Sequence, residues 1–67
     1  MLQDALKKHR ENHHLYQKEM ADKLGITREH YAQIEEGHKP PSISLLRRIS
    51  QELRMTIVFV VTPAKSV

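Results

Sequence analysis

Apolar residues recur at helical spacing over the first 53 positions of this chain and then merge into one continuous run. Spacings of three and four residues predict helices at about 3–13, 17–24, 28–36 and 43–53. In the first of these, Leu2, Leu6 and Arg10 share one face, which places a charged residue on or near the apolar stripe. The pattern therefore predicts a mainly α fold.

Residues that begin and end helices mark the predicted boundaries. Gly25 and Gly37 are natural left-handed terminators, and Thr27 is a good N-cap for the third helix. The two prolines at 40–41 cannot continue a helix, and Ser42 caps the next one. The apolar face expected on that fourth helix comprises Ile43, Leu46, Ile49, Ser50 and Leu53, with Leu45 beside it.

After Arg54 the chain changes character. Residues 55–62, Met-Thr-Ile-Val-Phe-Val-Val-Thr, are mainly β-branched or aromatic and precede a proline, which predicts one strand. A lone strand leaves its backbone hydrogen-bonding groups unpaired. We therefore divide the chain into a helical domain, 1–54, and a dimerisation element, 55–67.

The simplest partner for this strand is the same strand of a second copy, paired antiparallel about a two-fold axis. The contact residues would be Met55, Ile57, Val58, Phe59, Val60 and Val61. Two alternatives remain open: addition to the sheet edge of a different protein, and a frayed tail.

The run 17–37 predicts a helix-turn-helix, in which two short helices meet at a steep angle across a tight turn. Ala21 supplies a small residue at the contact and Gly25 supplies the turn. The positions expected to face inward are Met20, Ala21, Leu24, Ile26, Tyr31 and Ile34. The polar side chains left at the start of the second helix suit base edges in the DNA major groove. The alternative is an ordinary helical hairpin with a solvated polar face.

Composition narrows the function classes. The 67 residues make one domain at most, and such a short chain buries only about 60% of its unfolded surface, which favours a partner subunit. Eleven Lys and Arg against eight Asp and Glu give a net charge of +3, which fits an anionic partner. No apolar run approaches the roughly 20 residues of a membrane span, and no signal peptide is evident, so we expect a cytoplasmic protein without a membrane partner.

The sequence gives little support for a catalytic site or a metal site. The chain has no cysteine, and nothing around its five histidines completes a structural zinc site, although His9 and His13 have the i, i+4 spacing of a chelating pair. No nucleophile motif surrounds the serines and no Gly-rich phosphate loop occurs. We therefore expect no metal, no cofactor and no enzymatic activity.

A spaced motif then carries a family resemblance: Gln17-x3-Ala21-x3-Gly25-Ile26-Thr27, Ile34-Glu35-x-Gly37 and Pro41-Ser42. It resembles the phage repressor and Cro family, also called the Xre-type helix-turn-helix, over about 6–53. The resemblance implies a compact four-helix, lambda-repressor-like domain that binds double-stranded DNA, usually as a homodimeric transcription regulator on a palindromic operator. The C-terminal strand also resembles that of some antitoxin repressors, which implies a toxin protein as an alternative partner.

The resemblance also implies roles for single residues. It implies that the base-reading residues are Arg28, Glu29 and Gln33. Gln17, Thr27 and Lys39 would contact the DNA backbone, and Arg10 would form a structural ion pair with Glu35. Arginine pairs well with guanine, glutamine with adenine, and glutamate can accept a bond from cytosine.

Three positions depart from the family pattern. Tyr16 stands where Ser or Thr is usual and is a poor cap, and His14 stands where a glycine is usual, although histidine tolerates left-handed backbone better than most residues. Tyr31 replaces an aliphatic residue, and we expect its hydroxyl to reach a DNA phosphate. The strand replaces the fifth helix of many relatives.

Overall fold

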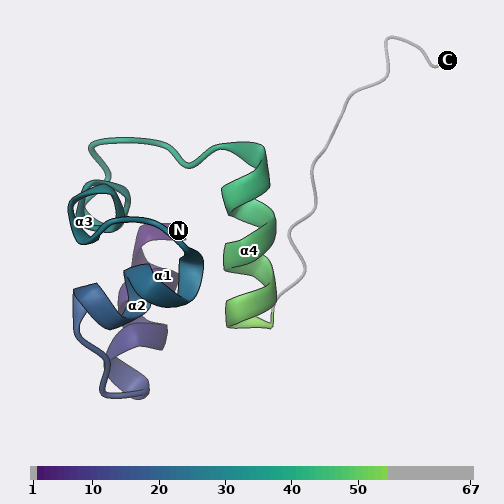
Figure 1. The fold of residues 1–67 in the computed structure, drawn as a ribbon. Coiled ribbons are helices and arrows are strands. Elements are labelled where there is room, and N and C mark those ends of the chain that lie inside the picture. The colour runs from purple at the N-terminus through teal and green to yellow at the C-terminus, as the bar shows by residue number, and fades with distance from the viewer. Residues whose placement is uncertain (1, 55–67) are drawn as a thin grey trace, which may run out of the picture.

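Four helices make up the structure, a computed structural model that describes residues 2–54 (Figure 1). They are α1 (Leu2–Asn12), α2 (Gln17–Leu24), α3 (Arg28–Glu35) and α4 (Ile43–Leu53). Each begins and ends within one residue of the bounds predicted from the sequence, which confirms the mainly α fold. The strand expected at 55–62 lies outside the described residues. Within residues 2–54, every helix is too short or too polar to span a lipid bilayer.

Side-chain caps begin α3 and α4 as predicted. The Thr27 hydroxyl accepts a hydrogen bond from the backbone N–H of His30 at 3.1 Å, and the Ser42 hydroxyl accepts one from Leu45 at 3.2 Å. At the other end of α2, Gly25 has φ +73°, the left-handed conformation that reverses the chain after a helix. These local signals keep α2 and α3 short and close together.

The turn between α1 and α2 uses less favourable residues. His14 adopts the left-handed conformation, with φ +55°, as its position predicts. Tyr16 is the N-cap of α2 but gives no side-chain cap, and its own N–H donates to the Glu19 carboxylate at 2.7 Å. The start of α2 therefore has only half of a capping box.

The core is centred on α2, which packs against α3 on one side and α4 on the other (Figure 1). α1 packs against α3. The buried residues are Leu6, Met20, Ala21, Leu24, Tyr31, Ile34, Leu45 and Ile49. Of the six positions expected to face inward in the helix-turn-helix, five are buried and Ile26 is half-buried.

The packed face of α4 differs from the one predicted. Leu45 and Ile49 are buried, whereas Ile43, placed on the apolar face by spacing alone, is 64% exposed. The Arg48 guanidinium, which lies on the Leu45–Ile49 side, donates to the Leu24 carbonyl at 3.3 Å. α4 is thus rotated so that this side meets α2. The prediction for Ile43 was wrong because helical spacing shows which residues share a face but not which part of that face a neighbouring helix covers.

Candidate nucleic-acid interface

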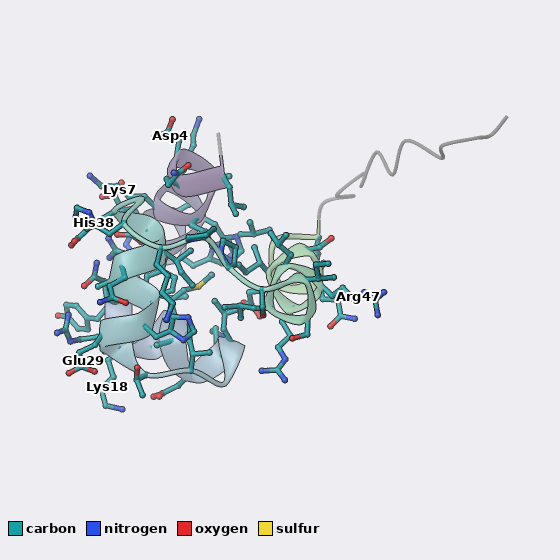
Figure 2. The ribbon with its side chains drawn as sticks, turned by 90° about the horizontal axis from the view of Figure 1, so that it is seen from above. Asp4, Lys7, Lys18, Glu29, His38 and Arg47 are labelled. Atoms are coloured by element: carbon teal, nitrogen blue, oxygen red, sulfur yellow. The ribbon has the colours of Figure 1, made fainter. Side chains whose placement is uncertain are left out.

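The outer side of α3 carries the three predicted base-reading residues. Arg28, Glu29 and Gln33 are all exposed, on the first two turns of the helix. Figure 2 shows Glu29 and Lys18 on one side of the domain, whereas Arg47 projects from α4 on the opposite side. Gln33 follows Glu29 by four residues and so continues the same face of the helix. The arrangement leaves a polar surface at the start of α3 with donors and acceptors for base edges.

Arg28 is held on both sides of its guanidinium. Its Nη1 lies 3.3 Å from Gln17 Oε1, and its Nη2 lies 3.9 Å from Glu29 Oε2. The first contact joins the start of α2 to the start of α3. Because both partners are polar side chains at the surface, Arg28 keeps a defined direction and still faces solvent.

The residues expected at the DNA backbone have different surroundings. Thr27 and Lys39 are exposed just before and just after α3, where each can approach a phosphate. Gln17 is half-buried, and its amide is shared between Arg28 and Glu35.

Tyr31 requires a correction. Its side chain is fully buried, and its hydroxyl donates to the carboxylate of Glu35, one turn later on α3. The expectation that it reaches a phosphate was wrong, because a buried phenol needs an internal partner and Glu35 provides it. The i, i+4 spacing of the two residues was the sequence signal for this contact.

Glu35 gathers donors from three helices. Arg10 of α1 makes a bidentate contact, Nε to Oε2 at 2.9 Å and Nη2 to Oε1 at 3.1 Å, while Gln17 of α2 donates to Oε1 at 3.2 Å. The Tyr31 hydroxyl of α3 also donates to Oε2. The Glu35 side chain is only 6% exposed, so its charge depends on these donors. The structure thus brings Arg10 and Glu35 together and adds two partners that the sequence analysis did not assign.

The network also changes the protonation of its members. Burial alone would raise the pKa of Glu35, but hydrogen bonds from Arg10, Tyr31 and Gln17 outweigh it and lower that pKa below its ordinary value. Burial, followed by the hydrogen bond to Glu35, raises the pKa of Tyr31. The carboxylate therefore stays ionised and the phenol stays neutral at physiological pH.

Within residues 2–54, no group of three metal-ligating side chains comes together. The ring of His13, in the turn after α1, packs instead against the ring of His9, with the two centroids 4.1 Å apart. His9 faces Glu52 of α4 at 3.7 Å, and Lys23 lies 4.0 Å from the same carboxylate. This cluster connects α1, α2 and α4 away from the exposed face of α3.

Two short packed helices, a glycine turn and an exposed polar face on the second helix define a helix-turn-helix DNA-binding domain. The family model HTH_3, described as "Helix-turn-helix", matches residues 6–60, most of the chain. The chain therefore belongs to this family of Xre-type DNA-binding transcription regulators. Searches of curated proteins and of solved structures gave no significant match.

The Arg10–Glu35 contact predicts a large stability effect. Arg10→Met should lower the free energy of unfolding by about 3–5 kcal/mol, because it leaves a buried carboxylate without its main countercharge. Urea or thermal denaturation followed by circular dichroism would measure the change. Lys18→Met is the control: it breaks the exposed Lys18–Asp22 pair and should cost less than about 1 kcal/mol. Equal losses in the two variants would contradict the role given to Glu35.

Glu35 also predicts an acid-dependent loss of stability. Its pKa is lower in the folded state than the ordinary value of 4.5, so the stabilisation is complete above pH 4.5 and is lost as pH falls through the folded pKa. Thermal unfolding at a series of pH values should show a steeper decline below pH 4.5 in the wild type than in Glu35→Gln. Glu36→Gln, at the exposed neighbouring position, should retain the wild-type slope.

Proposed function

We propose that this protein is a homodimeric, sequence-specific transcription repressor that binds a palindromic operator. The observation that carries the proposal is the position of Arg28, Glu29 and Gln33, exposed together on a helix whose far side is anchored by Glu35. A rigid helix with a free polar face suits the major groove, which accepts an α-helix and presents a distinct donor and acceptor pattern for each base pair.

Each exposed residue of α3 has a matching base chemistry. Arg28 can donate two hydrogen bonds to guanine, Gln33 can make the paired bonds that adenine offers, and Glu29 can accept from the cytosine amino group. Thr27, Lys39 and Gln17 would set the register by contacting phosphates on either side of the groove. Repression follows if the bound operator overlaps the site where transcription begins.

Two copies would place their α3 helices about one helical turn of DNA apart, roughly 34 Å, and so match a palindrome. The proposed connection is the run 55–62, paired with its counterpart about the two-fold axis. Its apolar composition supports a covered position, because an exposed β-prone segment promotes aggregation.

Substitutions at Gln33 and Lys39 should separate base reading from backbone binding. Gln33→Ala should reduce discrimination at one base pair by about 1–3 kcal/mol, whereas Lys39→Ala should weaken binding to all duplexes similarly and reduce the salt slope by about one. Selection of bound duplexes from a random pool supplies the operator, and gel-shift titration of operator and scrambled duplexes measures both effects. Arg47→Ala, which removes the same charge from the opposite side of the domain, should bind like the wild type. Sequence-independent losses in both Gln33 and Lys39 variants would contradict the reader assignment.

Truncation after Arg54 should convert the dimer into a monomer, because it removes the proposed pairing segment. Multi-angle light scattering would give the mass, and circular dichroism would check that the helices remain. A dimer that survives truncation would contradict pairing through 55–62.

The alternative function is that of an antitoxin, which neutralises a partner toxin and represses its own operon. The edge that 55–62 would offer to a different protein supports it. A full-length chain that is monomeric alone and forms a stable hetero-complex with the product of a neighbouring gene would favour this alternative over the homodimer.

A further inference from the structure

A cavity of about 630 Å³ opens between the turn after α1, the last turn of α2 and the end of α4. Its apolar walls are the side chains of Leu15 and Leu53, both half-buried against the core. Small-molecule sites typically have volumes of roughly 300–1,000 Å³, so the cavity is large enough for one. The exposed residues of α3 do not line it, which makes it separate from the candidate DNA interface.

The charged groups around this cavity leave one cation available. The Glu52 carboxylate lies 3.7 Å from His9 Nε2 and 4.0 Å from Lys23 Nζ, so its charge is offset within the wall. Arg54 also lines the cavity, and within residues 2–54 its guanidinium has no hydrogen-bond or ion-pair partner. A guanidinium binds carboxylate and phosphate groups through two parallel hydrogen bonds. Arg54 is therefore the group that an anionic ligand would meet.

Arg54 also occupies a backbone position that favours glycine. It is the C-cap of α4 and has φ +54°, in the left-handed region. Glycine takes this conformation without steric cost, whereas a residue with a Cβ does not. The Arg54 N–H donates to the Gln51 carbonyl at 3.3 Å, which holds the residue in place. Strained residues of this kind cluster at ligand sites, which directs attention to what the arginine side chain does there.

Two imidazole rings add flat surfaces to the same cavity. The Nδ1 atom of His13 lies 2.9 Å from the carbonyl oxygen of His9, and because a carbonyl only accepts, this nitrogen is the donor. The bond restrains the His13 ring, whose centroid is 4.1 Å from that of His9. Aromatic groups pack favourably against one another in stacked or edge-to-face arrangements. The rings and the two leucines thus suit the apolar or aromatic body of a ligand.

We infer that this cavity binds a small organic anion, with a carboxylate or phosphate group on Arg54 and an apolar or aromatic body against Leu15, Leu53 and the histidine rings. The inference goes beyond the proposed DNA-binding function and does not depend on it. It gives the chain a second ligand, at a site formed by α1, α2 and α4.

Titration of the full-length, ¹⁵N-labelled chain with phenylacetate and with phenyl phosphate tests the inference by nuclear magnetic resonance. Saturable shifts are expected at the amides of His13, Leu15, Lys23 and Leu53, and the stronger of the two probes identifies the preferred acidic group. Acetate carries the charge without the body, and phenylacetamide carries the body without the charge. Both controls should bind about tenfold more weakly, because each lacks one of the two contacts.

Substitutions at Arg54 test the anion contact itself. Arg54→Gln should raise the dissociation constant of the stronger probe about tenfold, because it removes charged hydrogen bonds. Arg47→Gln is the matched control: it makes the same change on α4 outside the cavity and should bind like the wild type. Arg54→Gly should also weaken binding, yet raise the midpoint of thermal unfolding by about 4 °C, because glycine suits the left-handed position. Loss of affinity in that variant cannot then be loss of folding.

The outcomes separate this inference from the proposed function. Shifts that do not saturate, or an Arg54→Gln variant that binds the probe as tightly as the wild type, would overturn the inference. A chain that binds the operator but neither probe would do the same. A chain that binds a probe at this cavity but no DNA duplex at low salt would reject the proposed function and support the inference.

Discussion

The hydrogen bonds that the buried Glu35 carboxylate accepts are the interaction on which the rest of the structure depends. Burial of apolar side chains holds the helices together but is non-directional, so the eight buried residues within 2–54 would by themselves leave the angles between short helices poorly fixed. The bidentate contact with Arg10 and the bond from Gln17 are directional, and they join α1 and α2 to the last turn of α3. The orientation of the exposed face of α3 is therefore set from the inside of the domain.

The same network extends to the surface through one side chain. The Gln17 amide donates to Glu35 and accepts from Arg28, so an exposed guanidinium is connected to a buried carboxylate through a single residue. Ordering a free arginine on binding costs side-chain entropy, and a side chain that is already restrained loses less. A chain with a net charge of only +3 gains from such pre-organisation, because general attraction to the DNA backbone is modest.

Local signals in the sequence were sufficient for the helices, and tertiary contacts account for what they missed. Capping residues, glycines and prolines act within a few positions, and they predicted the helix bounds within one residue. The face of α4 depends on how it meets α2, so spacing alone misplaced Ile43. Arg10 and Glu35 are 25 positions apart, and only the family resemblance suggested their pairing. The Tyr31 hydroxyl donates to the Glu35 carboxylate one turn away, and the sequence did not show that this carboxylate is buried.

The small size of the exposed face on α3 is one reason for proposing that two copies of the chain bind DNA together. If Arg28, Glu29 and Gln33 read bases as proposed, about 1–3 kcal/mol of discrimination from each would give roughly 3–9 kcal/mol. Specific binders separate their sites from bulk DNA by about 4–10 kcal/mol, so one copy reaches that range only if no contact is weak. Glu29, which lies 3.9 Å from Arg28, offsets part of the attraction that this arginine has for DNA. In the proposed dimer, two copies on one palindrome would double the number of readers, and the proposed linkage between them would make the second binding step intramolecular.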